Sequence, residues 1–312
     1  MRRLIIILAL AFTAISCHRN EPLHVCAHFT VTTASAGTKG FQDDDSKIDK
    51  LDLLVFRDSD GRLEARASGD GSSPLEVTVS RGRKMNWYIV ANAPDGRIPF
   101  CTRESEFLET AILLEDGFVM HSQGKTTFME SGSVITAAMS RYVCKVGIGR
   151  ISIKWGDALP CRLETVALMN VQGSSPVSGI PADLPLRYNC GAIDTSLDGL
   201  LSASPGIEIE SSSPVNIGLS FWCMPNPSEG NSYGLPWQPR RTRIALCIHA
   251  YGQDNWYPID LPAMEGNRFY CVDDIVIKGP GASAPDTLLV RVTSTFTVRV
   301  LDWAEEDAPA VF

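Results

Sequence analysis

The chain has 312 residues, of which 44% are hydrophobic and 21% are charged, with a formal net charge of -8. A chain of this length can bury a sizeable core and is long enough for two domains. Lysine and arginine are scattered singly in an acidic chain, without a basic stripe interleaved with aromatic residues, which argues against a nucleic-acid-binding surface.

The first seventeen residues are typical of a bacterial lipoprotein signal. Arg2 and Arg3 form a basic region, and the apolar run 4–15 is too short to span a bilayer. Small residues then precede Cys17. We therefore predict that the signal covers residues 1–17 and that the exported protein begins at Cys17, where fatty chains hold it on a membrane.

Cys17 apart, eight cysteines remain, and none forms a CxxC pair. Cys144, Cys223 and Cys247 lie inside apolar runs, where a free cysteine is a common core residue. An even number of cysteines in an oxidising compartment is also compatible with disulfides. The sequence leaves both possibilities open and does not fix a connectivity.

Almost the whole mature sequence alternates apolar and polar residues, as β-strands do, between clusters of turn-forming residues. Across 141–155 the alternation changes phase near Gly147 and Gly149, which predicts a bulge or bend. One short helix is predicted for 104–115, on whose apolar stripe lie Phe107, Leu108, Ala111, Ile112 and Leu114. In chain order, the clearest strands are His24–Thr33, 48–55, Leu75–Ser80, 85–91, 207–209, 215–221, 244–248 and 290–300.

We predict an all-β chain of two tandem sandwiches, covering 18–155 and 156–312. Both ends carry strands that could complete a sheet in their own molecule or in a neighbour. The apolar face of the first strand consists of Val25, Ala27, Phe29 and Val31. That of the last consists of Val290, Val292, Phe296, Val298 and Val300.

Several motifs that suggest ligands fail on spacing. The run 124–126 lacks the glycine of a phosphate loop, and 58–61 lacks the glutamate of a calcium loop, so both are read as turns. The acidic run 43–45 is read as a solvated loop, and His24 and His28 share a strand face without an evident third metal ligand. We expect no metal and no cofactor.

Nothing in the sequence supports an enzyme. No Gly-x-Ser-x-Gly elbow occurs. The adjacent carboxylates Glu305 and Glu306 lie in the C-terminal tail, where nothing encloses a substrate. We therefore expect a chain without catalytic activity.

Four segments and the lipid-attachment cysteine together resemble the fimbrillins of the Bacteroidales. This superfamily of lipoprotein-precursor pilins includes major fimbrial subunits and related anchor, accessory and tip proteins. Each segment alone is a degenerate strand-and-turn pattern, and their order and spacing carry the resemblance. The segments are 48–61 (IDKLDLLVFRDSDG), 87–94 (WYIVANAP), 139–145 (MSRYVCK) and 272–281 (VDDIVIKGPG).

The resemblance implies transthyretin-like sandwiches with Greek-key topology, delivery to the outer membrane, and assembly with other fimbrial subunits by strand exchange, serving adhesion or biofilm formation. Proteolysis after the first strand removes that strand, and a neighbour's terminal strand fills the groove. Carried over to this chain, the removable strand is His24–Thr33, the processing loop is 34–47 and the donor strand is 290–300. The loop contains Lys39 and Lys47 but no arginine. Either Lys39 is the processing site, or the chain stays uncut as a lipid-anchored basal subunit.

A second hypothesis is a lipid-anchored surface module that does not polymerise. It would bind a glycan or a host or bacterial surface protein through Trp222, Trp237 and Trp256. Aromatic residues in such strands more often belong to the core or to sheet edges. The sequence therefore favours the fimbrial hypothesis without excluding this one.

Overall fold

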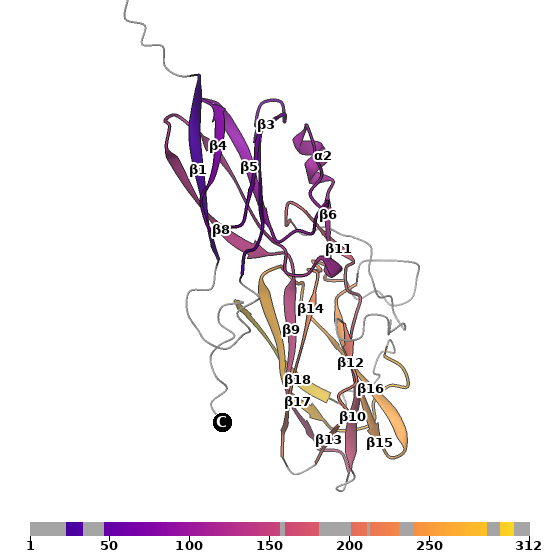
Figure 1. Ribbon diagram of the computed structural model, residues 1–312. Helices are drawn as coiled ribbons and strands as arrows, with labels where there is room; N and C mark the ends of the chain where they lie inside the picture. Colours follow the sequence, from indigo (N-terminus) through magenta and orange to yellow (C-terminus); the bar gives the residue numbers. More distant parts are fainter. Residues whose placement is uncertain are drawn as a thin grey trace, which may run out of the picture.

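Two β-sandwiches lie end to end in an elongated molecule (Figure 1). The computed structural model describes residues 23–33, 47–156, 160–180, 201–210, 213–230, 240–285 and 294–302. Within these ranges the only α-helix is α2 (Glu104–Leu108), and no helix has the length and apolar character needed to cross a bilayer. The prediction of an all-β chain with one short helix is confirmed.

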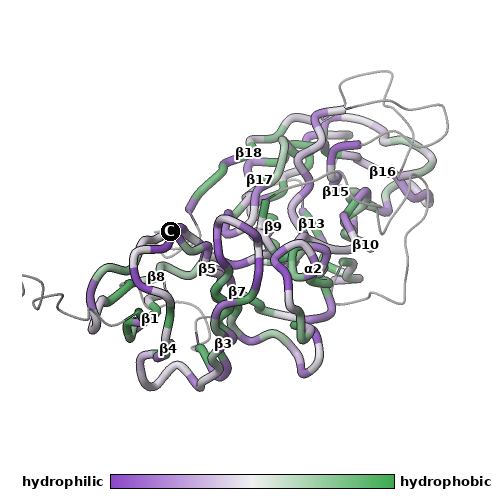
Figure 2. Tube along the Cα trace, turned by 90° about the horizontal axis from the view of Figure 1, so that it is seen from above, coloured by the Kyte–Doolittle hydropathy of each residue, from purple (hydrophilic) through white to green (hydrophobic). Residues whose placement is uncertain are grey.

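The N-terminal sandwich is a single seven-stranded sheet that curls until its edge strands approach each other. Its strand order is β3-β2-β5-β7-β8-β1-β4, and every neighbouring pair is antiparallel except β1 with β8. Hydrophobic and hydrophilic residues are interspersed along its trace (Figure 2). Buried and exposed residues alternate along 75–80, whereas 51–56 is buried on both faces. The strands are β1 (His24–Thr33), β2 (Leu51–Arg57), β3 (Leu63–Gly69), β4 (Leu75–Ser80), β5 (Lys84–Ala91), β7 (Met120–Thr127) and β8 (Ser133–Arg141).

The C-terminal sandwich consists of two facing sheets, β14-β9-β17-β18 and β12-β10-β15-β16, with β13 also paired to β10. All pairs are antiparallel except β9 with β17. The strands are β9 (Cys144–Ile153), β10 (Cys161–Met169), β12 (Ser202–Ala203), β13 (Ile207–Ile209), β14 (Val215–Cys223), β15 (Arg243–Ala250), β16 (Gln253–Asp260), β17 (Arg268–Ile277) and β18 (Ser294–Asp302).

One apolar cluster bridges the two sandwiches, and a second one, the N-terminal core, lies within the N-terminal sandwich alone. One buried cluster runs from Leu54 and Phe56 on β2, past Phe107 on α2, into the interior of the C-terminal sandwich. A small ladder between β6 (Ala111–Leu113) and β11 (Ser174–Pro176) crosses the junction. Strand β9 starts three residues after β8 ends and pairs only with strands of the C-terminal sandwich. Residue 155, the predicted domain boundary, lies two residues after the end of β9.

The helix prediction for 104–115 is wrong beyond residue 108. Phe107, Ile112 and Leu114 are buried as their spacing suggests, but Leu108 is 38% exposed. After α2 the chain extends into β6 and then forms the short 3-10 turn η1 (Leu114–Asp116). Pairing with β11 satisfies the backbone of β6, and this tertiary contact overrides the helical spacing.

The phase change near Gly149 coincides with a register shift that keeps one core filled, and the extra residue lies on β14. Ile148 and Ile151 lie on opposite sides of the phase change, yet both are buried in the same cluster. The pairing of β9 with β14 shifts register at this point. A side chain at Gly149 would overlap the carboxylate of Asp273 on β17, so glycine makes room for that buried acid.

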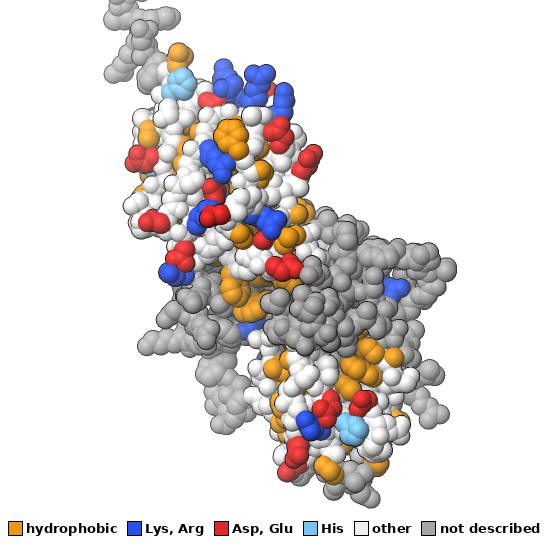
Figure 3. Space-filling model, turned by 45° about the vertical axis from the view of Figure 1, so that its right-hand side comes forward, with side chains coloured by type: hydrophobic (Ala, Val, Ile, Leu, Met, Phe, Trp, Pro, Cys, Tyr) orange, Lys and Arg blue, Asp and Glu red, His pale blue; other side chains and the backbone are white. Residues whose placement is uncertain are grey.

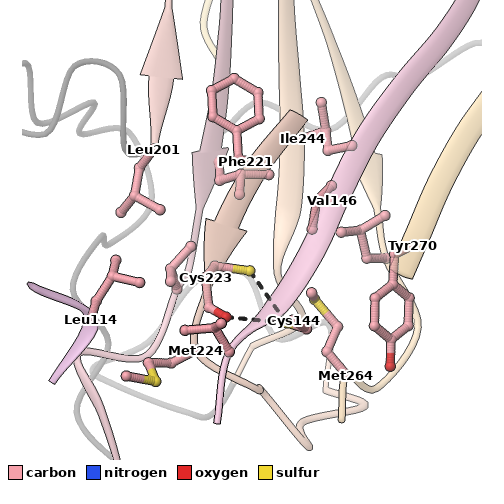
Figure 4. Packing of buried hydrophobic residues seen from close by; sticks show 14 of the residues in the cluster. Leu114, Cys144, Val146, Leu201, Phe221, Cys223, Met224, Ile244, Met264 and Tyr270 are labelled. Atoms are coloured by element: carbon pink, nitrogen blue, oxygen red, sulfur yellow. Dashed lines mark hydrogen bonds between the residues drawn. The ribbon is translucent and has the colours of Figure 1, made fainter. Parts of the chain in front are cut away.

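The core of the C-terminal sandwich contains two cysteines that face each other (Figure 4). Cys144 on β9 and Cys223 on β14 are direct cross-strand partners, both fully buried, with their Sγ atoms 3.5 Å apart. Burial, with Cys223 beside it, raises the pKa of the Cys144 thiol well above its usual value. Because the thiolate is the reactive form, oxidation of this pair is disfavoured once the core has closed.

We predict that export through an oxidising compartment links Cys144 to Cys223 before the core closes, by exchange with a disulfide donor. The bond would close a loop spanning 79 residues and stabilise the fold by about 2–4 kcal/mol. Alkylation of the unfolded exported chain without reductant, followed by peptide mass spectrometry, should recover the two cysteines linked and Cys101 alkylated. Alkylation of both Cys144 and Cys223 would contradict the prediction.

Gly124, in β7, lies against the indole of Trp87 in the N-terminal core, and a Cβ there would overlap the ring. We predict that Gly124→Ala destabilises the protein by about 1–3 kcal/mol in urea denaturation, because Trp87 is packed and cannot move freely. Lys125→Ala is the control, since it removes only an exposed ion pair with Asp58 and should change stability by less than about 1 kcal/mol. Equal effects of the two substitutions would show that this packing is not tight.

Candidate assembly surfaces

The first predicted strand, β1, is an interior strand of its sheet. It pairs antiparallel with β4 on one side and parallel with β8 on the other (Figure 1). Val25 is opposite Val79 on β4, and Ala27 is opposite Ser133 on β8. Both rows of its backbone groups therefore take part in ladders, although it is the first element of the described chain.

The inward face of β1 fills the N-terminal core. Val25, Ala27 and Phe29 are at most 2% exposed, and Val31 is half-buried. The ring of Phe29 packs edge-on to Trp87, with centroids 5.6 Å apart, and lies 6.1 Å from Phe128. Burying a large apolar side chain contributes about 1.5–3 kcal/mol. Loss of β1 would thus leave an apolar groove between β4 and β8, which we call the β1 groove.

Few polar side chains fasten β1. The Cys26 N–H donates to Ser131 Oγ at 3.1 Å, and the Thr30 hydroxyl donates to the Ile135 carbonyl at 3.3 Å. The Cys26 carbonyl accepts from the N–H of Gly132 at 2.8 Å. The strand is therefore held mainly by backbone pairing and by its apolar face, two kinds of contact that another alternating strand could reproduce.

The last strand, β18, is an edge strand that pairs with β17. Val298 is half-buried against the core, whereas Phe296 is 41% and Val300 51% exposed. Val290 and Val292, predicted for the same apolar face, lie outside the described residues. The described part of the predicted donor strand thus has one free edge and a poorly covered apolar face.

Two ion pairs tie β18 to its own sandwich. Arg299 donates to Asp273 on β17, with Nη2 and Oδ2 3.1 Å apart, and Asp302 contacts Arg268. The side chain of Asp273 is only 12% exposed, and its Oδ1 accepts the backbone N–H groups of Arg150 and Asp274. Desolvation opposes ionisation of Asp273, but these hydrogen bonds and the charge of Arg150 outweigh it and lower the pKa of the carboxyl.

Most of the other predicted site residues lie outside the residues that the structure describes. Cys17 and Lys39 lie outside the described residues, as does most of the predicted processing loop. Lys47, at the end of that loop, pairs with Asp49 at 2.8 Å. The sequence analysis did not predict the ion pair between Arg299 and Asp273, because the contact depends on the register between β17 and β18. Only the position of Arg299 on the polar face of the last strand could be read from the sequence.

The tryptophans of the binding-module hypothesis have structural contacts. Trp222 packs edge-on to Phe118, with ring centroids 4.7 Å apart, and the Lys145 ammonium lies 5.2 Å from its ring. Trp256 pairs through its backbone with Ala282. Trp237 lies outside the described residues. Trp222 and Trp256 belong to different sheets, and Trp222 contributes to packing.

The surface does not display a basic stripe on the face shown in Figure 3. Acidic and basic side chains lie interspersed among hydrophobic ones over the described part of this face, apart from a group of basic side chains at its upper tip. This distribution agrees with the compositional argument against a nucleic-acid surface.

A polar cleft lies at the junction of the sandwiches, lined by His121, Arg141, Asn267, Arg268 and Asp302 among others. His121 stacks on Tyr142, with ring centroids 4.4 Å apart. Burial lowers the pKa of His121 to about 4, so the ring is neutral at neutral pH. Arg268 and Asp302, the ion pair that holds the end of β18, lie in the wall of this cleft.

Residues 27–147 match the family model of the major fimbrial subunit protein (FimA). The match runs from β1 to the start of β9 and so covers the N-terminal sandwich. This part of the chain is similar to the FimA family. The matching model describes a fimbrial subunit, which bears out the prediction that the chain is not an enzyme.

Solved structures of similar proteins extend the likeness to both sandwiches. A fimbrilin (FimA) from Porphyromonas gingivalis W83 has a TM-score of 0.58 at 14% identity, covering 89% of this chain and 97% of that one. The tip fimbrial protein Mfa3 from Porphyromonas gingivalis, with a C-terminal truncation, has a TM-score of 0.55 at 15% identity, covering 90% and 100%. A proposed cell adhesion protein from Bacteroides eggerthii scores 0.64 at 15% identity, covering 91% and 96%. No curated protein matches the sequence. At such identities the structures show a shared fold.

We predict that Asp273→Asn weakens the attachment of β18 and lowers the unfolding free energy by about 1.5–3 kcal/mol at neutral pH. Because the folded pKa of Asp273 is depressed, its contribution is present above the unfolded value near 3.9 and is lost as pH falls through the folded pKa. Urea denaturation at neutral and acidic pH measures both effects.

Asp274→Asn is the matched control, because that side chain is 59% exposed and pairs with Arg150 at the surface. It should change the unfolding free energy by less than about 1 kcal/mol. The role assigned to Asp273 fails if the two variants behave alike, or if the effect of Asp273→Asn does not shrink in acid.

Proposed function

We propose that the chain is a structural subunit of a cell-surface fimbria, exported as a lipoprotein through Cys17 to the outer membrane and assembled with other fimbrial subunits by β-strand exchange. Its biological role is adhesion or biofilm formation. The observation that carries the proposal is the position of β1, which completes the N-terminal core yet joins the rest of the chain through a single segment, 34–46.

Strand exchange follows physically from removal of β1. Cleavage at Lys39 would detach the strand from β2 and allow it to leave, exposing two unpaired strand edges and the vacated sites of Val25, Ala27 and Phe29. Exposed edges and apolar grooves of this kind favour pairing with another strand. The β1 groove is therefore the acceptor in the proposed joint.

The donor is the terminal strand of a neighbouring subunit. Phe296, Val298 and Val300 alternate with polar residues at the two-residue period with which Val25, Ala27 and Phe29 fill the groove. In its own molecule β18 is an edge strand with exposed apolar residues, so its release breaks one ladder and the two ion pairs described above. Release is therefore less disruptive than loss of a core strand.

We further propose transthyretin-like Greek-key topology for both sandwiches, in keeping with the fold shared with the fimbrilin. Two forms of the subunit are compatible with the loop sequence. If a protease that accepts lysine cuts at Lys39, the chain joins the stalk and loses its lipid with β1. If it is not cut, Cys17 keeps it on the membrane as an anchor.

Controlled cleavage of the purified chain by a lysine-specific protease tests strand exchange. We expect cleavage in the 34–47 loop to yield oligomers that resist cold detergent in gel electrophoresis, and the double variant Lys39→Gln with Lys47→Gln to prevent them. Mapping the new N-terminus of the cut native chain should place the first cut after Lys39. Val298→Asp should abolish the oligomers because it places a charge on the inserted face. Thr297→Asp, on the opposite face of the same strand, should not.

A chain that stays monomeric after release of β1 would disprove assembly by this groove. The first residue of the protein recovered from cells separates the two forms. Acylated Cys17 identifies the anchor, and a residue near Gly40 identifies the processed stalk subunit.

A further inference from the structure

Three side chains with metal-binding groups meet on the outer face of the β1–β4 pair. Cys26 and His28 are two residues apart on β1 and so project from the same face, and His28 is directly opposite Glu76 on β4. His28 Nε2 lies 3.9 Å from Cys26 Sγ, and His28 Nδ1 lies 3.3 Å from Glu76 Oε1. One donor atom of each residue lies within 4.8 Å of those of the other two.

We infer that Cys26, His28 and Glu76 form a Zn²⁺ site. A thiolate, an imidazole and a carboxylate are ligands that Zn²⁺ accepts at about 2.0–2.3 Å, and tetrahedral geometry then separates the donor atoms by roughly 3.3–3.8 Å. The separations in the structure are within roughly an ångström of this range. Water would take the fourth position.

The strand framework already provides most of the required arrangement. Cys26 and His28 are half-buried on a strand that is paired on both sides, so their Cβ positions are fixed. The side chain of Glu76 is 67% exposed and can turn toward the ion. Only modest rotation of the His28 ring and of Glu76 is needed to bring all three donors to one centre.

The site differs from the pair that the sequence suggested. His24 and His28 share the outer face of β1, but four residues of strand separate them by roughly 13 Å, which is too far for one ion. The third ligand comes from β4, 48 residues after His28, and only the β1–β4 register places it there. A search for closely spaced ligands in the sequence therefore cannot find this site.

Zn²⁺ at this site would cross-link β1 to β4. Two ligands lie on the strand that is removed in the proposed assembly and one on the strand that remains, so the ion and strand release oppose each other by mass action. This consequence rests on the proposed function. The metal site itself does not, because it depends only on the geometry of the intact chain.

Equilibrium titration of the reduced full chain with Zn²⁺, against a competing chelator, tests the site. We expect one ion per chain, with affinity reduced about 10-fold or more in Cys26→Ser, His28→Gln and Glu76→Gln. With Co²⁺ as the probe, the native chain should show a thiolate-to-cobalt charge-transfer band that Cys26→Ser removes. His24→Gln, on the same strand face, is the matched control and should bind as the native chain does.

If the native chain shows no saturable Zn²⁺ binding, the inference is wrong, and the contact between His28 and Glu76 is only a polar contact between two side chains. Equal binding by the native chain and by Glu76→Gln would overturn it too, as would a loss in His24→Gln as large as in the three ligand variants. These outcomes do not depend on whether the chain forms fimbriae.

Release of β1 after cleavage of the 34–47 loop tests the cross-link. Zn²⁺ should slow the release of the strand from the native chain, and a chelator should restore the rate. The Glu76→Gln variant keeps the whole apolar face of β1 and should release it at the same rate with and without Zn²⁺. If Zn²⁺ binds but leaves the native rate unchanged, the cross-link is disproved while the site stands.

Discussion

The N-terminal sandwich depends on the insertion of its first strand between two others. β4 and β8 do not pair with each other, and β1 supplies the ladder partner that both require. The same strand places Phe29 between Trp87 and Phe128, so the core and the sheet are completed by one segment. In the sequence, β1 is also the strand nearest the predicted lipid on Cys17. The same segment would therefore attach the chain to the membrane and complete its N-terminal core.

The elements that the sequence predicted well are those in which local alternation and burial agree. His24–Thr33 and Leu75–Ser80 form strands with the predicted bounds, because each inward residue meets a core and each outward one meets solvent. The phase change at Gly149 was also readable, since a register shift is needed to keep Ile148 and Ile151 on one core. These features could be predicted because they are determined by residues that are close together in the sequence.

The features that could not be predicted depend on pairing between distant segments. Ala111–Leu113 has helical spacing but forms a strand because Ser174–Pro176 supplies its partner. Glu76 joins Cys26 and His28, and Asp273 meets Arg299, only through the registers of two strand pairs. The alternation of apolar and polar residues along a strand predicts which face of the sheet each residue occupies. It does not predict which residue of the neighbouring strand lies opposite.

The direction of β1 bears on how a fibre of such subunits would carry load. β1 runs along the length of its sandwich, which in turn lies end to end with the C-terminal one (Figure 1). A strand occupying the β1 groove and pulled along that direction would be loaded in shear, with the hydrogen bonds of both ladders resisting together instead of opening one after another. The continuous apolar core that crosses the junction would oppose bending between the sandwiches, so tension would pass through each subunit as through a stiff link.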